Sequence, residues 1–269
     1  MYLKTVRYLK ENIPDKFTYP FNIPSLSTLD EIQLPTNITF FVGENGSGKS
    51  TLLEAIADLC EFNTAGGGRQ HLYDVHKSDS ALSDYIRLSW KRKISRGFFL
   101  RAETFYQFAS HIDLMDEPEV IKYASYGGKS LHQQSHGESF LSLFQNTFGK
   151  KSLYLLDEPE AALSPVRQLS LMKIMKDLEK EAQFIIATHS PILLAYPDAT
   201  IYSFDDGKIE TVRYEDTLNY IVTKSFLNAP DRMLDELFKE DLKRILCLPN
   251  NEYEVCKYVT VKTDKCGRF

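Results

Sequence analysis

The sequence is poor in cysteine, has no long apolar run and carries no excess of positive charge. None of its four cysteines forms a Cys-x-x-Cys pair, a pattern that favours reduced thiols over a disulfide framework or a zinc site. No stretch approaches the roughly 20 apolar residues that span a bilayer, and residues 1–16 do not resemble a secretory signal. With 32 Lys and Arg against 37 Asp and Glu, the chain as a whole is no polycation for coating nucleic acid. We therefore expect a cytoplasmic globular protein without an integral membrane segment.

Apolar segments alternate between strand-like and helix-like patterns along the 269 residues. Helices are expected from near Lys49 and over residues 164–183, and residues 201–212 read as a hairpin around Asp205-Asp206-Gly207. Residues 104–149 read as helical, with a break at Gly127-Gly128, and residues 63–80 as a loop. The expected strands cover residues 2–9, 38–42, 85–90, 98–102, 153–156 and 184–187. Such alternation predicts an α/β fold with a largely parallel central sheet flanked by helices.

Residues 43–50 read G-E-N-G-S-G-K-S and match the phosphate-binding pattern G-x-x-x-x-G-K-[ST]. The loop lies between a predicted strand and a predicted helix, as the mechanism requires. Its backbone N–H groups and the helix N-terminus attract phosphate, Lys49 neutralises charge, and the Ser50 hydroxyl completes a Mg²⁺ shell. The candidate phosphate-binding residues here are Glu44, Asn45, Gly46, Ser47, Gly48, Lys49, Ser50 and Thr51.

Residues 153–159, L-Y-L-L-D-E-P, form an apolar strand that delivers two carboxylates at its C-terminal end. Ligands of open α/β sheets bind at that end. Asp157 is placed to hold Mg²⁺, and Glu158 to orient or deprotonate the attacking water. Further upstream, Ser135-His136-Gly137-Glu138 has the S-x-x-E form of a capping box at the start of a helix.

The order of these motifs resembles that of the ABC-type ATPases, and most of all the small soluble members related to SMC and overcoming-lysogenization-defect proteins. Ser135 to Glu138 resembles their L-S-G-G-Q signature, with His136 and Glu138 as departures. Ala162-Leu163-Ser164 resembles the D-loop, and His189, in A-T-H-S-P, resembles the switch histidine that contacts the γ-phosphate. The resemblance extends over residues 2–238.

The resemblance implies a P-loop NTPase fold of the ABC-ATPase type in a single domain, with an N-terminal antiparallel β portion. Residues 1–103 and 150–245 would form the nucleotide-binding lobe and residues 104–149 a helical signature subdomain; residues 246–269 form a tail to which we assign no role. Glu158 and His189 would be catalytic, and Ser50, Asp157 and Glu103 would contact Mg²⁺. Gln107 competes with Glu103 for the Q-loop position. Tyr19 or Phe21 would stack on adenine unless these aromatics belong to a small β-core, and Arg7 would approach the phosphates unless it forms a surface ion pair.

In this family ATP lies between the phosphate loop of one subunit and the signature helix of the other. Ser135 and Gly137 would therefore bind the ATP held by a second copy, so the resemblance predicts an ATP-gated homodimer that hydrolyses ATP with Mg²⁺. Two alternatives stay open, the ATP-binding subunit of a membrane transporter and a nucleotide sensor with negligible turnover. The diverged signature and Glu103 argue against a transporter partner. A role in DNA maintenance or defence also stays open, and the basic cluster of Lys91, Arg92, Lys93 and Arg96 is either a nucleic-acid contact or a solvated edge.

Overall fold

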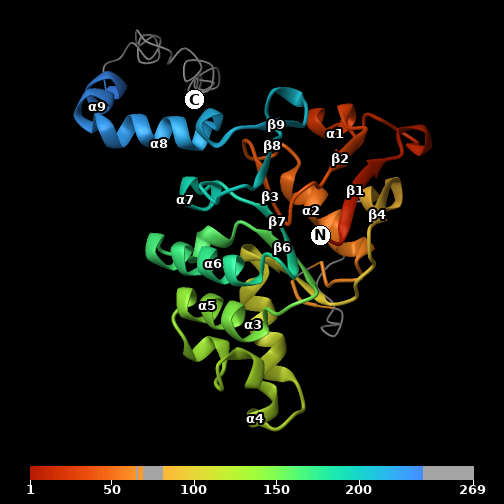
Figure 1. Ribbon diagram of the computed structural model, residues 1–269, viewed down its shortest axis with the longest axis vertical. Helices are drawn as coiled ribbons and strands as arrows, with labels where there is room; N and C mark the ends of the chain where they lie inside the picture. The colour runs from red at the N-terminus through yellow and green to blue at the C-terminus, as the bar shows by residue number, and fades with distance from the viewer. Residues whose placement is uncertain (65, 69–80, 239–269) are drawn as a thin grey trace, which may run out of the picture. The chain divides into compact units, whose positions relative to one another are not determined.

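Two β-sheets organise the first 212 residues in the computed structural model (Figure 1), which describes residues 1–64, 66–68 and 81–238. The strands are β1 (Leu3–Tyr8), β2 (Glu31–Gln33), β3 (Ile38–Val42), β4 (Ile86–Trp90), β5 (Gly97–Arg101), β6 (Ser152–Asp157), β7 (Ala182–Ala187), β8 (Thr200–Ser203) and β9 (Glu210–Val212). The helices are α1 (Pro24–Thr28), α2 (Lys49–Leu59), α3 (Phe105–Leu114), α4 (Glu119–Lys122), α5 (His136–Thr147), α6 (Pro165–Leu178), α7 (Pro191–Leu194), α8 (Leu218–Asn228) and α9 (Pro230–Phe238).

The larger sheet has the order β5-β6-β7-β3-β8-β9 and is parallel except for β9, which pairs antiparallel with β8. The smaller sheet, β2-β1-β4, is antiparallel. This confirms the predicted α/β class, the largely parallel central sheet, the N-terminal antiparallel portion and the hairpin. Strands β3, β6 and β7 are buried along their whole length, as expected for parallel strands covered on both faces.

Helix α2 lies against both sheets and contacts β4, β6 and β7. Its apolar stripe includes Leu52, Leu53 and Ile56, all fully buried. One core cluster joins these side chains to Leu3 and Val6 of the small sheet and to Leu155 and Ile185 of the large sheet. Burial of each such side chain stabilises the fold by roughly 1.5–3 kcal/mol, so the start of α2 has a rigid support.

The segment between β5 and β6 is helical, as predicted, and holds α3, α4 and α5. Gly127 and Gly128 both adopt positive φ and end the short helical turn that follows α4. Figure 1 shows α3, α4 and α5 gathered at the bottom of the view. Their packing is aromatic, with the rings of Phe105 and Phe140 only 4.0 Å apart.

Helix α6 is shorter than the predicted span of residues 164–183, because it ends at Leu178 and Gln183 belongs to β7. The tertiary structure supplies the reason. The fully buried Gln183 amide accepts hydrogen bonds from the backbone N–H groups of Tyr2 and Leu3 and donates one to the Leu3 carbonyl. Gln183 therefore joins β7 to the small sheet, a contact that helical periodicity does not reveal.

Two compact units divide the chain, Met1–Val212 and Arg213–Phe269. In the described part of the second unit, Thr217 caps α8, and α9 follows. Residues 65 and 69–80 of the expected loop and the tail from residue 246 lie outside the described residues. No helix among residues 1–64, 66–68 and 81–238 is long and apolar enough to cross a bilayer.

Candidate nucleotide-binding site

The loop from Gly43 to Gly48 joins β3 to α2 and has the backbone of an anion-binding nest. Gly46 and Gly48 have φ values of 79° and 98°, which other residues rarely adopt. At Gly48 a Cβ would also lie 3.1 Å from side-chain atoms of Ile23 and Leu26, so a larger residue would crowd the support of the loop. The glycines thus allow the loop to turn its N–H groups inward at the start of α2.

Lys49 is folded back onto this loop. Its ammonium donates hydrogen bonds to the carbonyls of Gly43 at 2.7 Å and Glu44 at 3.0 Å, and the residue is only 4% exposed. Burial lowers the pKa of Lys49, whereas the nearby carboxylates of Glu158 and Asp157 act in the opposite direction. A buried ammonium among acids and carbonyl oxygens is well placed to meet phosphate.

Asp205, which the sequence did not single out, holds the loop from the β8 side. Its Oδ1 accepts the Glu44 N–H at 2.9 Å, and its Oδ2 accepts the Ser203 hydroxyl at 2.9 Å. The only sequence signal at this residue was the hairpin turn, which carries no information about the phosphate loop. β3 and β8 are neighbours in the sheet, and this pairing brings Asp205 to the loop.

Ser50 and Asp157 meet although 107 residues separate them. The Ser50 hydroxyl donates to Asp157 Oδ1 at 2.9 Å. Asp157 is 4% exposed, and burial raises its pKa to about 6 against the opposing effects of Ser50 and Arg101. No group of three His, Cys, Asp or Glu residues in the described chain could hold a metal by itself. One hydroxyl and one carboxylate fit Mg²⁺, which usually takes its other oxygens from phosphates and water.

Arg101 at the end of β5 is a second residue missed by sequence reasoning. It is the register partner of Asp157, and its Nε lies 3.8 Å from Asp157 Oδ2. The same guanidinium lies 3.2 Å from Glu54 and 3.5 Å from Glu103. Arg101 therefore balances three carboxylates, and the strand pairing places it where its sequence neighbours gave no signal.

The two Q-loop candidates differ in their surroundings. The Glu103 side chain is 75% exposed and contacts Arg101, which links it to the Asp157 carboxylate. Gln107 lies exposed on α3. The metal role of Glu103 stays a prediction.

Glu158 and His189 lie opposite each other, just after the neighbouring strands β6 and β7. Glu158 has φ 50°, ψ 50°, and its N–H donates to the Ala187 carbonyl at 2.9 Å, so the chain turns sharply directly after β6. Glu158 Oε1 lies 3.7 Å from His189 Nε2. Both side chains are partly exposed, Glu158 by 40% and His189 by 33%.

The helix that begins after Ser135 has the predicted capping box. The Glu138 carboxylate accepts both the backbone N–H of Ser135, at 3.0 Å, and its hydroxyl, at 2.6 Å. These bonds lower the pKa of Glu138. Gly137 is packed closely, because a Cβ there would lie 2.9 Å from the Ala162 carbonyl and 2.2 Å from Arg167. The start of α5 is thus seated on the segment that resembles the D-loop.

Comparison with known proteins places this geometry in a family. Residues 38–113 and 140–195 match the family described as "AAA domain, putative AbiEii toxin, Type IV TA system". A "Putative ABC transporter ATP-binding protein" of Bacillus thuringiensis subsp. konkukian is 30% identical over 187 residues, which cover 62% of this chain and 32% of that protein. The phosphate import ATP-binding protein PstB of Colwellia psychrerythraea is 25% identical over 214 residues, covering 69% and 74% of the two chains. The chain belongs to the ABC-type P-loop ATPases.

The chain therefore spans about a third of the length of the Bacillus relative. Among solved structures, an ATP-binding cassette of an ABC transporter in its ADP conformation aligns with a TM-score of 0.46 and 17% identity. That alignment covers 83% of this chain and 95% of the other.

The two aromatic candidates for adenine stacking in this ABC-type ATPase lie in different environments. Phe21 is 5% exposed and packs edge-on against Tyr85, with ring centroids 4.9 Å apart. Tyr19 is 60% exposed, and its hydroxyl lies 3.2 Å from the Thr51 hydroxyl on α2. Phe21 is a core residue, whereas Tyr19 is available beside the phosphate loop. Arg7 lies exposed on β1, opposite Glu31 and Arg87.

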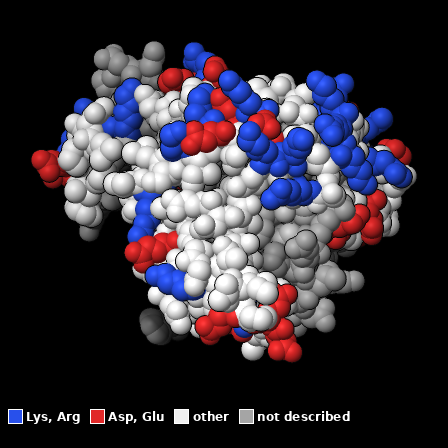
Figure 2. All heavy atoms as spheres, turned by 60° about the horizontal axis from the view of Figure 1, so that its bottom comes forward, with Lys and Arg blue, Asp and Glu red and all other residues white. Residues whose placement is uncertain are grey.

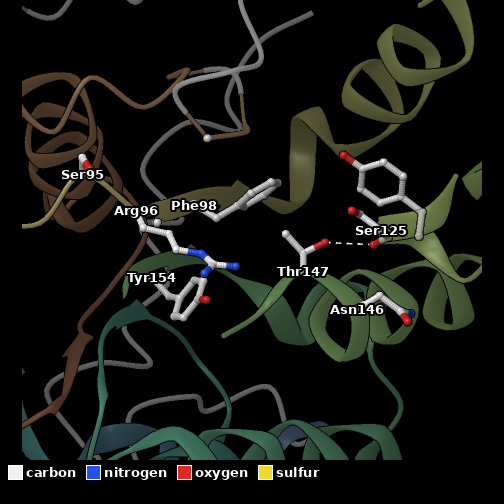
Figure 3. Close-up of a pocket in the computed structure, with 10 residues that line it drawn as sticks. Ser95, Arg96, Phe98, Ser125, Asn146, Thr147 and Tyr154 are labelled. Carbon is white, nitrogen blue, oxygen red and sulfur yellow. Dashed lines mark hydrogen bonds between the residues drawn. The ribbon is translucent and has the colours of Figure 1, made fainter. Parts of the chain in front are cut away.

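A cavity of about 620 Å³ lies near the N-terminal ends of β5 and β6 in the large sheet (Figure 3). Its lining includes Arg96, Phe98 and Tyr154 from the beginnings of β5 and β6, and Thr147 from the end of α5. The phosphate loop, Asp157 and His189 follow the opposite ends of their strands. The cavity is therefore separate from the candidate nucleotide-binding site.

Proposed function

We propose that this ABC-type ATPase binds ATP with Mg²⁺ and hydrolyses it to ADP and phosphate. One observation carries the proposal: a lysine in a glycine-rich loop, the Ser50–Asp157 pair and the Glu158–His189 pair all lie at the C-terminal ends of neighbouring strands in one sheet. Phosphoryl transfer needs an anion cradle, a site for a divalent cation and a group that orients water, and these residues supply all three.

Each residue has a role in the proposal. The backbone of residues 44–51 cradles the phosphates, and Lys49 neutralises their charge. Ser50 and Asp157 hold Mg²⁺, which when bound offsets charge on the phosphate oxygens. Glu158 orients the attacking water and accepts its proton. His189 contacts the γ-phosphate from the strand next to β6.

We further propose that two copies of the chain hold ATP between them. Ser135 is exposed at the N-terminus of the twelve-residue helix α5, where the helix dipole favours an anion. Ser135 and Gly137 would contact the ATP held by the phosphate loop of the second copy. ATP then favours the dimer, and hydrolysis releases it.

Light scattering of Glu158→Gln tests the dimer. This variant keeps the cradle but lacks the base, so we expect it to form a dimer with ATP and Mg²⁺ and to stay monomeric without them. Lys49→Ala is the matched control and should stay monomeric in both conditions. A monomer of Glu158→Gln at saturating ATP argues against the proposal.

Phosphate release tests hydrolysis and separates an enzyme from a nucleotide sensor. Loss of a general base lowers a rate by about 10²–10⁴-fold, so Glu158→Gln should release phosphate at least a hundredfold more slowly than the wild type. ATP binding without release by the wild type identifies a sensor. Because the two curated relatives are named as transporter or import ATP-binding proteins, co-purification with a membrane subunit would assign that partner instead.

A role at nucleic acid is a second candidate, and exposed charge favours it. Lys91, Arg92, Lys93 and Arg96 are all exposed between β4 and β5. Figure 2 shows Lys and Arg gathered on one side of the face in view, although the net charge of the chain is −5. Duplex DNA binding that weakens with salt, and weakens further when Lys91, Arg92 and Lys93 are replaced by Gln, is expected from this surface. No binding at low salt removes this candidate.

A further inference from the structure

Two side chains from outside the segment, the partly buried Glu160 and the buried Gln168, hold residues 188–190, which contain His189. Glu160, in the turn after Glu158, accepts the His189 backbone N–H through Oε1 at 2.5 Å. Gln168, on α6, accepts the Ser190 hydroxyl through Oε1 at 2.5 Å. His189 and Ser190 are thus both held by side chains of the segment that runs from β6 into α6.

Gln168 also reaches back to the turn before its own helix. Its Nε2 donates to the Leu163 carbonyl at 3.0 Å, and the residue is 7% exposed. A carbonyl can only accept a hydrogen bond, so this contact fixes which end of the amide carries the donor. Gln168 consequently links Ser190 to Leu163, inside the segment that resembles the D-loop.

Burying the Glu160 carboxyl costs free energy, which packing contacts alone do not offset. Burial raises the pKa of Glu160, although hydrogen bonds with the His189 backbone and with the Thr188 side chain act in the opposite direction. Burying a carboxyl costs free energy that its hydrogen bonds must offset. One compensating contact is the backbone of the residue whose imidazole faces Glu158.

The imidazole needs such an anchor. A third of the His189 side chain is exposed, so core packing on every side does not fix the ring. Its Nε2 lies 3.7 Å from Glu158 Oε1, and a shift of about 1 Å in a reacting group can cost on the order of 10²-fold in rate. Hydrogen bonds to the His189 backbone and the Ser190 side chain fix the backbone position from which the imidazole extends.

We propose that Glu160 and Gln168 are positioning residues for hydrolysis, which hold His189 opposite Glu158 and tie it to the Leu163 turn. This inference rests on the proposed ATPase activity. Neither side chain is among the residues proposed to contact the nucleotide, so both act through His189, mainly on the turnover rate and only slightly on nucleotide affinity.

A double-mutant cycle with His189→Ala tests the inference. Glu160→Leu removes the acceptor at similar size, and Glu160→Gln keeps an oxygen for the His189 N–H. We expect Glu160→Leu to lower kcat by about 10- to 100-fold, with KM and the dissociation constant of ATP within about twofold of the wild type. Glu160→Gln should keep most of kcat. In the His189→Ala background, Glu160→Leu should have little further effect, because the two changes remove one function.

Gln168→Leu runs the same cycle independently and replaces Glu160→Leu if that variant does not fold. Glu117→Leu, an exposed glutamate before α4, is the matched control. Equal losses of kcat with and without His189, or an unchanged kcat in Glu160→Leu and Gln168→Leu, overturn the inference while the proposed function stands. A wild type that binds ATP without turnover overturns the proposed hydrolysis itself, and the inference with it.

Discussion

The Ser50 hydroxyl donates a hydrogen bond to Asp157 Oδ1 over 2.9 Å, which joins the first turn of α2 to the end of β6. The two oxygens proposed to hold Mg²⁺ therefore lie side by side in the fold. Ser50 and Asp157 would hold a cation there without a movement of α2 toward β6. Preorganisation of this kind lowers the cost of binding.

Asp157→Asn should stabilise the protein at alkaline pH. Burial raises the pKa of Asp157 to about 6 from its ordinary 3.8, so the folded protein holds this proton more tightly than the unfolded chain. The free energy of unfolding therefore falls as the pH rises from about 4 to 6 and stays lower above that range. Asparagine does not ionise, so the variant should gain about 1–3 kcal/mol at pH 8 and little near pH 4.

Urea unfolding of the wild type and Asp157→Asn without Mg²⁺, at pH 4.5 and pH 8, checks this difference. Asp58→Asn, at an exposed position of α2, is the control and should show no such gain. Parallel pH profiles of the wild type and Asp157→Asn would show that the buried carboxylate carries no penalty.

Tyr19→Ala should weaken ATP binding by about 5- to 150-fold, because stacking on a base contributes roughly 1–3 kcal/mol. Tyr19 is exposed and lies beside Thr51, so stability should hardly change. Calorimetry with ATP and with inorganic triphosphate separates the contributions, because triphosphate has no base and should bind both proteins equally. Phe21→Ala is expected instead to lower stability by about 3–5 kcal/mol. An equal loss for both ligands would assign Tyr19 to the phosphates.

Arg101→Met should lower stability and raise the Mg²⁺ requirement. The change removes the ion pair of the mostly buried Glu54 and leaves Lys49 as the cation near Asp157, at a cost of about 1–3 kcal/mol. Since Arg101 lowers the pKa of Asp157, its loss raises that pKa further and weakens the metal site. Thermal unfolding and a Mg²⁺ titration of phosphate release measure the two effects.

Glu103→Gln is compared with Arg101→Met in the same thermal unfolding and Mg²⁺ titrations. Its ion pair with Arg101 is exposed, so stability should change by less than about 0.5 kcal/mol. A raised Mg²⁺ requirement in Glu103→Gln, without one in Gln107→Ala, supports the metal role of Glu103. The reverse result assigns the Q-loop position to Gln107.

Asp205→Ala should weaken ATP binding by about three- to tenfold, because the Glu44 N–H then loses its acceptor and the phosphate loop becomes less ordered. Asp205→Asn keeps an acceptor oxygen and should bind nearly as the wild type does. Titration with a fluorescent ATP analogue compares them. Equal affinities for Asp205→Ala and the wild type would mean that the loop holds its shape without this contact.

The sequence by itself determined the parts of the site that depend on local chemistry. Positive φ at Gly46 and Gly48, the cap of Glu138 on Ser135 and the buried strand that ends in Asp157 follow from short-range sterics, helix capping and hydrophobicity. These features require no knowledge of distant residues, and the predicted elements were therefore correct in type.

Only the tertiary structure decided which residues support that site. Arg101, Asp205 and Gln168 reach it through strand register and helix packing, and their sequence neighbours give no sign of these contacts. Gln183 lies in β7 and not in the predicted helix, and its hydrogen-bond partners are at the N-terminus of the chain. Long-range pairing depends on how the whole core packs, so no local pattern encodes it.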